Sequence, residues 1–229
     1  DLLPWPRPGA LGEEGRADRF LRFVQEELFP FVETEYRTKP YRILVGPQAA
    51  GVFGLFALLE APGAFQALIL NDPCLVDHPE RSLCRELAGL ARTPGNGRIF
   101  IAVSEDTGSR PGAHAGLEAL KMELEGGTQP EFRWRIALHS EWPYFLAPVD
   151  ARDALEELFA AYPFPEPAAA GSLGPIQAHY RTASAELGFP LEPPDLVLTL
   201  AANGMMERGA HAEARETFQH LVELYPSSM

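Results

Sequence analysis

The chain has 229 residues, of which 46% are hydrophobic, and a net charge of −13 from 19 basic and 32 acidic residues. This length suffices for one large domain, or for one domain with a small appendage. The acidic charge argues against binding to nucleic acid or anionic membranes, and no apolar run reaches the roughly 20 residues of a membrane span. We expect a soluble protein, and because no signal peptide is recognisable, cytoplasm and periplasm both stay open.

The amino-terminal part combines an irregular loop with one long helix. Residues 1–15 are rich in proline and glycine, which predicts a loop. The next segment, 16–34, has apolar residues at helical spacing, and we expect this apolar face to pack on a sheet: Phe20, Leu21, Phe23, Val24, Leu28, Phe31 and Val32.

The stretch from Arg42 to Gly51 organises the rest of the chain. The apolar run 43–45 predicts a buried strand at 42–45, and a fully apolar run over 52–59 predicts a buried helix. Between them lies a turn of small residues bracketed by Gly46 and Gly51, and this arrangement is typical of the nucleophile elbow of α/β-hydrolases. The central position holds Gln48, whose carboxamide is neither a nucleophile nor a base at neutral pH.

Strands and helices alternate through the following segments. Strands are predicted over 66–70, 98–103 and 131–138, and helices over 79–91, 114–124 and 151–162. The alternation predicts a mostly parallel sheet with helices on both faces, which is the α/β class. The last strand alternates apolar and basic residues, so we expect it near an edge of the sheet.

The strand pattern stops at a linker over 162–174 that is rich in proline, alanine and glycine. We expect two domains, an α/β-hydrolase-like domain at 1–165 and an all-helical appendage at 175–229. Helices are predicted over 176–187, 193–208 and 210–224. The last two are similar in spacing to one tetratricopeptide helix pair, on the residues Gly204, Gly209, Ala214, Phe218, Leu221 and Pro226.

One such helix pair cannot bury both of its faces, because these repeats are stabilised by their neighbours. We therefore expect the helices over 176–224 to form an interaction surface for a protein partner. A plain helical hairpin that caps the domain is the alternative.

The residues Tyr36-Arg37-Thr38 and 40–46 resemble the esterase D and enterobactin-esterase branch of the α/β-hydrolases, in which this stretch reads Y-R-T-x-P-x-R-I-L-x-G-H-S-x-G-G. The resemblance covers residues 16–162. It aligns the histidine of the motif with Pro47, the nucleophilic serine with Gln48, and the first paired glycine with Ala50.

The resemblance also implies where the other catalytic positions lie. The carboxylate falls on Glu105, with Asp106 beside it, and the histidine base falls on Pro143. The oxyanion hole would use the amide of Ala49. Because the nucleophile and the base are both replaced, and loss of either costs about 10⁴ to 10⁶ in rate, no route to an acyl-enzyme remains at these positions.

Our first hypothesis is a catalytically inactive, esterase-like protein that serves as a binding or structural subunit of a larger assembly. A ligand pocket would be lined by Gln48, Ala49, Glu105, Trp142 and Tyr144, next to Pro143. The alternative is an active serine-type carboxylic ester hydrolase that uses displaced residues, with Ser104, Ser140 and His139 as candidates.

No cofactor or metal is expected, because the histidines and cysteines lack the spacing of a metal site. Cys74 and Cys84 are interpreted as two buried thiols.

In the resembling branch, several strands and the oxyanion loop precede a stretch similar to the first residues of this chain. We therefore expect an upstream segment or a separate chain beside the strand at 42–45. This expectation has a direct structural consequence: within residues 1–229, that strand should have unpaired backbone on one side.

Overall fold

The computed structural model describes residues 3–4, 15–73, 82–94, 99–106, 114–139 and 143–226. The chain forms two compact units, Asp1–Glu156 and Glu157–Met229. The division lies inside a helix and ahead of the predicted linker at 162–174. The independent folding of the predicted domains at 1–165 and 175–229 stays a prediction.

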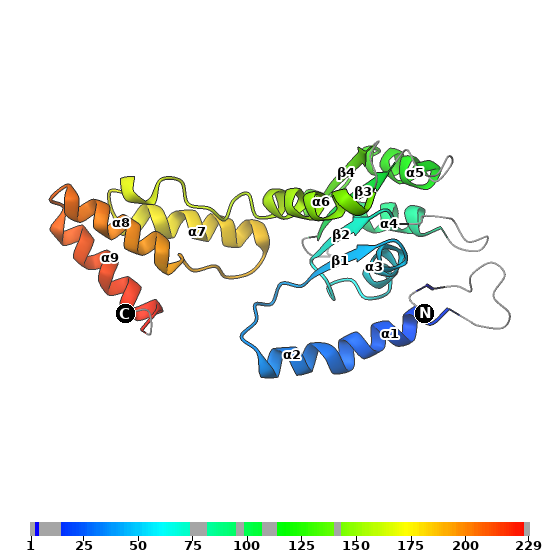
Figure 1. Cartoon of the computed structure of the whole chain (residues 1–229), viewed down its shortest axis with the longest axis horizontal. Coiled ribbons are helices and arrows are strands. Elements are labelled where there is room, and N and C mark those ends of the chain that lie inside the picture. The colour runs from blue at the N-terminus through cyan, green and yellow to red at the C-terminus, as the bar shows by residue number, and fades with distance from the viewer. Residues whose placement is uncertain are drawn as a thin grey trace. The chain divides into compact units, whose positions relative to one another are not determined.

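The first unit contains a four-stranded parallel sheet in the order β1-β2-β3-β4 (Figure 1). The strands are β1 (Ile43–Pro47), β2 (Ala67–Asn71), β3 (Ile99–Asp106) and β4 (Phe132–His139). The predicted α/β class with a mostly parallel sheet is confirmed. Within the described residues β1 ends the sheet, so its backbone is paired on one side, as expected for the strand at 42–45.

Helices cover the two faces of the sheet. Residues on alternate positions of a strand point to opposite faces, and Leu68 and Leu70 join a core with three helices on one side: α3 (Ala49–Glu60), α4 (Leu83–Arg92) and α5 (His114–Glu125). On the other face Ile69 lines a small cavity together with Ala154 of the helix α6 (Pro143–Leu158). Because all four strands are parallel, their carboxyl ends lie at one edge of the sheet.

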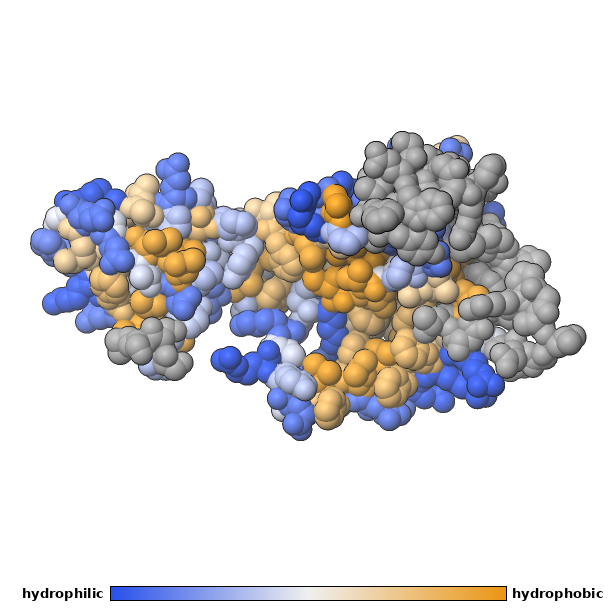
Figure 2. Space-filling view, viewed as in Figure 1, coloured by the Kyte–Doolittle hydropathy of each residue, from blue (hydrophilic) through white to orange (hydrophobic). Residues whose placement is uncertain are grey.

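The predicted helix at 16–34 is present as α1 (Ala17–Phe23), a π-helical segment η1 (Val24–Leu28) and α2 (Phe29–Glu35). The expected packing of its apolar face on the sheet is mostly wrong. Only Leu21 and Val24 of that face are buried, and α1 packs against α3. Figure 2 shows apolar side chains along the visible face of α1 and α2, and more than a third of each of these side chains is exposed: Phe20, Phe23, Leu28 and Phe31.

Two elements differ from their predicted bounds in ways that affect the site. β3 continues to Asp106 instead of ending at 103, because its ladder with β4 runs on to the pair Asp106 and His139. α6 begins at Pro143 instead of 151, and Pro148 lies inside it. A proline at the first helical position is favourable, whereas a proline in the interior usually breaks a helix. The sequence around Pro148 therefore indicated a break, and the part of α6 before residue 151 was not predicted.

The second unit contains α7 (Leu173–Leu187), α8 (Asp195–Glu207) and α9 (His211–Leu224), preceded by a short 3₁₀ turn, η2 (Pro167–Ala169). Its core is apolar and includes Ile176, Tyr180, Leu198, Met205 and Ala214. These helices correspond to the three predicted ones. In the described part of the chain, no helix is long and apolar enough to cross a membrane.

Candidate functional site

The site is built around the sharp turn between β1 and α3. Gln48 has backbone angles φ 48° and ψ −116°, a conformation that side-chain-bearing residues seldom adopt. Its amide donates a 2.8 Å hydrogen bond to the carbonyl of Asn71, and its carbonyl accepts one of 2.9 Å from the amide of Gly51. The backbone therefore has a tight strand-turn-helix geometry with Gln48 at its apex.

The two glycines that bracket the turn are needed for the close approach of strand and helix. A Cβ atom added to Gly46 would lie 2.6 Å from the carbonyl oxygen of Ala50. One added to Gly51 would lie 2.9 Å from the Cβ of Pro73 and 3.0 Å from the carbonyl oxygen of Gly46. These distances are shorter than a Cβ atom tolerates, which is the physical reason for small residues at a nucleophile elbow.

Ala49 is the first residue of α3, directly after Gln48. The first amides of a helix have no partner within the helix, and the helix dipole adds partial positive charge at this end. The turn can therefore hold an electronegative ligand atom at the amide of Ala49, as the resemblance implies for an oxyanion hole.

Polar groups beyond the predicted site residues lie at the same edge of the sheet. Asn71 ends β2, and its side chain donates a 3.2 Å hydrogen bond to the carboxylate of Asp150 in α6. Asp72 follows with a positive φ of 49°, and both Asp72 and Asp150 are buried. The run Asn-Asp-Pro after a buried strand is visible in the sequence, where it indicates only a turn, so sequence reasoning missed these groups.

The expected carboxylate position lies on a strand rather than in a loop. Glu105 and Asp106 are the last two residues of β3, and they pair in register with Leu138 and His139 of β4. The ladder thus brings a carboxylate residue and a histidine to neighbouring positions at the carboxyl end of the sheet. Ser104 directly precedes them and pairs in register with Asn71 of β2.

The histidine position of the motif, Pro143, is the first residue of α6, and Tyr144 follows it in the same helix. Trp142 and Ser140 lie outside the described residues, as does Cys74. The structure consequently brings Gln48 and Ala49 together with the ends of β2 and β3, while the predicted pocket with Glu105, Trp142 and Tyr144 stays a prediction.

No group of three or more histidine, cysteine or acidic residues that could hold a metal ion is present among the described residues. Cys84 is a buried free thiol whose sulfur lies 3.6 Å from the carbonyl oxygen of Gly116. It lies on α4, and we assign it no part in the site.

Comparison with known proteins gives a family match that includes the elbow. The family described as "Putative esterase" matches residues 4–80. The ferri-bacillibactin esterase BesA of Bacillus subtilis (strain 168) is 36% identical over 76 residues, which are 33% of this chain. The matched segment spans about a quarter of that relative, 24% of its length.

Solved structures match over both units. An IroE-like serine hydrolase from Shewanella oneidensis has a TM-score of 0.70 at 19% identity, covering 93% of this chain and 71% of that one. A protein from Capnocytophaga ochracea DSM 7271 has a TM-score of 0.64 at 14% identity, covering 92% of this chain and 60% of that one. At these identities the likeness concerns the fold alone.

Proposed function

From the premise that its first unit belongs to the esterase-like branch of the α/β-hydrolases, we propose that this chain is a non-catalytic member of that branch. It acts as a binding or structural subunit of a larger assembly. The observation that carries the proposal is Gln48, which occupies the apex of an intact elbow with φ 48°. Its carboxamide cannot attack an ester carbonyl, so the turn presents a residue without nucleophilic chemistry.

The same geometry supports ligand binding without turnover. The amide of Ala49 at the start of α3 can donate to a ligand oxygen, and the Gln48 carboxamide can donate and accept hydrogen bonds. Glu105, Trp142 and Tyr144 complete the proposed pocket. BesA is named as a ferri-bacillibactin esterase, so ferri-bacillibactin is the first ligand we would test for binding to this chain.

An ester hydrolysis assay tests the proposal. The wild-type chain is mixed with short-chain p-nitrophenyl esters, and we expect a rate equal to that of buffer. The Gln48→Ala variant provides the matched control, because it removes the side chain and keeps the turn. Turnover well above background that disappears in this variant would refute the non-catalytic assignment.

The subunit role is supported by the edge position of β1. We propose that an upstream segment or a separate chain pairs with this edge. Val45 is 58% exposed, although it belongs to an apolar strand of the kind usually found inside a parallel sheet. A second strand would pair the open backbone and cover this side chain. Hydrogen exchange of those β1 amides that face away from β2, slow in the assembly and fast in the isolated chain, would support this pairing.

A second candidate is an active ester hydrolase that uses displaced residues. The register pair Asp106 and His139 favours it, because the ladder puts an acidic residue and a histidine at neighbouring backbone positions, and a catalytic triad needs both residue types. Ser104 and Ser140 are the candidate nucleophiles. If the wild-type chain hydrolyses esters and His139→Ala abolishes the activity while Gln48→Ala does not, this candidate replaces the first.

A further inference from the structure

We propose that Asn71 and Asp150 form a positioning pair, which fixes the helix α6 against the elbow and so sets the geometry of the candidate site. Asn71 ends β2, and its side chain donates a 3.2 Å hydrogen bond to the carboxylate of Asp150 on α6. The inference rests on the proposed role of the elbow as a ligand site. It adds the residues that hold the elbow and α6, which carry the proposed pocket, at one separation.

Asn71 joins the elbow to α6 because it uses its backbone for one and its side chain for the other. Its carbonyl accepts the 2.8 Å hydrogen bond from the amide of Gln48 at the apex of the elbow. Its side chain reaches Asp150, which lies about two helical turns after Pro143, the first residue of α6. A displacement of α6 relative to the elbow would therefore stretch one of these two bonds or move the end of β2.

Asp150 lies where a carboxylate costs free energy unless it is hydrogen-bonded. Its exposed fraction is 9%, and together with Ala154 it lines the small cavity on this face of the sheet. Most of the other side chains around the cavity are apolar, among them Ile69 of β2 and Val103 of β3. A buried charged group is stable only with a partner of good geometry, so the pair selects one arrangement of helix and strand, whereas two apolar residues would tolerate several.

A second polar contact also ties α6 to the sheet, but it is weaker. Arg135 of β4 lines the same cavity, and its guanidinium lies 4.0 Å from the carboxylate of Asp153 on α6. The two side chains are 34% and 32% exposed, so solvent screens this ion pair and it contributes little. The bond between Asn71 and Asp150 is shorter and more buried, and Asn71 is the residue that also bonds to the elbow.

The distance between the elbow and α6 tests the proposal directly. Spin labels are attached to Gln48→Cys and Val149→Cys in the 229-residue chain, which also carries Cys74→Ser and Cys84→Ser. Double electron–electron resonance then gives the distribution of label-to-label distances. Val149 is 41% exposed and directly precedes Asp150, so its label reports the anchored part of α6. We expect one narrow distribution in this parent chain.

Asn71→Asp tests the pair with almost no change in side-chain size. It places a second carboxylate against that of Asp150, and because the two repel each other we expect a broader or displaced distribution. The double variant Asn71→Asp/Asp150→Asn exchanges the two groups and keeps one donor and one acceptor, so it should restore the parent distribution. If Asn71→Asp does not fold, Asn71→Ala is the second variant. It removes the donor and should also broaden the distribution.

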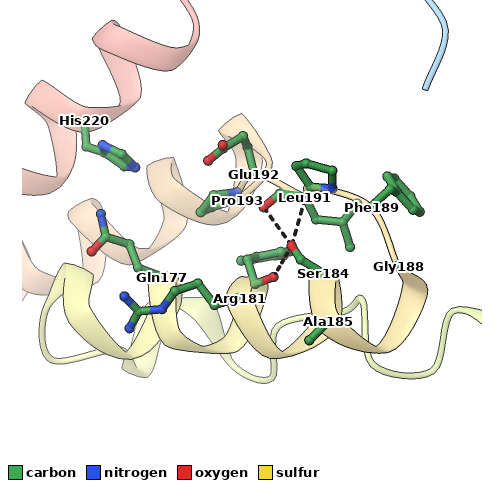
Figure 3. A pocket seen from close by; sticks show the side chains of 12 residues that line it. Gln177, Arg181, Ser184, Ala185, Gly188, Phe189, Leu191, Glu192, Pro193 and His220 are labelled. Carbon is green, nitrogen blue, oxygen red and sulfur yellow. Dashed lines mark hydrogen bonds between the residues drawn. The ribbon is translucent and has the colours of Figure 1, made fainter. Parts of the chain in front are cut away.

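Two controls remove other side-chain hydrogen bonds. Gln129→Ala removes a carboxamide that donates a 2.9 Å hydrogen bond to the carbonyl of Arg92 in the same unit. Ser184→Ala acts in the helical unit, beside a groove with a volume of about 660 Å³ (Figure 3). There the hydroxyl of Ser184 donates to the carbonyl of Tyr180 and accepts from the amide of Leu191. Both controls should leave the distance distribution unchanged.

Three results would overturn the positioning role. These are a broad distribution in the parent chain, an unchanged distribution in the folded Asn71 variants, and a double variant that does not restore the parent distribution. Equal broadening in Gln129→Ala would also overturn it, because the effect would then be a general loss of packing. Ligand binding is a separate readout. If the distribution responds as expected and ferri-bacillibactin does not bind, the positioning pair stands and the proposed ligand is wrong.

Discussion

The amide of Gln48 donates a 2.8 Å hydrogen bond to the carbonyl of Asn71, which joins the apex of the elbow to the end of β2. It continues the parallel ladder by one residue beyond the register pair Pro47 and Asn71. Because the bond uses only backbone atoms, the elbow geometry does not depend on which side chain stands at position 48. The turn therefore does not require a nucleophilic side chain at its apex.

The strain at Gln48 predicts a difference between two substitutions. Gln48→Gly and Gln48→Ala both remove the side chain, but only glycine adopts φ 48° and ψ −116° without a steric penalty. We expect Gln48→Gly to have a higher free energy of unfolding than Gln48→Ala by about 1 kcal/mol, measured by urea denaturation. If the alanine variant is as stable as the glycine variant, the turn is not strained.

A second prediction concerns the packing of α8 on η2. A Cβ atom added to Gly204 would lie 2.1 Å from the carbonyl oxygen of Ala168, which is backbone and cannot move aside cheaply. Arg208, one turn later, donates hydrogen bonds to the carbonyls of Ala168 and Ala170. These hydrogen bonds also hold α8 against the segment that contains η2. Gly204→Ala should destabilise the helical unit by about 3 kcal/mol.

Gly174→Ala is the control for that substitution. Gly174 lies in the first turn of α7, and an added Cβ would meet only the hydroxyl of Ser172 at 4.0 Å. The free energy of unfolding of the Gly174→Ala variant should stay within about 1 kcal/mol of that of the wild type. Thermal denaturation followed by circular dichroism compares the two variants, and similar melting temperatures would contradict the close approach at Gly204.

The positions of most elements could be predicted from the sequence, because apolar periodicity reports which residues face a core. The strand predicted at 42–45 overlaps β1, which runs from Ile43 to Pro47, and the helix predicted at 52–59 falls inside α3. The elbow was predictable as well, because two glycines that bracket a turn between apolar runs indicate a close approach of strand and helix. Gly204 and Gly209 stand out in the sequence only by their spacing, and the structure adds a close backbone approach for the first and a φ of 78° for the second.

Other features depend on tertiary contacts that a local pattern does not contain. The extension of β3 to Asp106 is set by its pairing with β4. The bond between Asn71 and Asp150 joins residues far apart in the chain. The exposure of Phe31, at 57%, was not predictable, because its helical spacing reports an apolar face but not what covers that face. The groove beside Ser184 likewise follows from the path of a loop.

Tyrosine burial predicts how stability depends on pH. Burial raises the pKa of Tyr180 from 10.0 to about 12, and the nearby Tyr162 and Tyr225 add to the increase. The native state then keeps a proton that the unfolded state loses, so stability is full below pH 10 and falls as the pH rises towards 12. Urea denaturation from about pH 9 to about pH 12 should show a midpoint that declines in this window.

The Tyr180→Phe variant separates the effect of Tyr180 from that of Tyr41. Burial also raises the pKa of Tyr41 to about 12, although the positive charge of Arg133 acts to lower it. The decline should be shallower in the variant, and its ultraviolet absorbance titration at 295 nm should lack one tyrosine that ionises near pH 12. An identical pH dependence in both proteins would show that Tyr180 does not contribute.

The last prediction is that catalysis can be restored at the elbow. Gln48→Ser places a hydroxyl at the apex of a turn that already has the required backbone geometry, with the amide of Ala49 next to it. Pro143→His places an imidazole at the start of α6, at the position that the resemblance assigns to the base. The double variant should hydrolyse p-nitrophenyl acetate above the wild-type rate, whereas Gln48→Ser alone should gain little, because an unactivated serine is a weak nucleophile. Equal rates in the folded double variant and the wild type would contradict the claim that these two replacements silence the site, and would point instead to divergence of the acid or of the oxyanion hole.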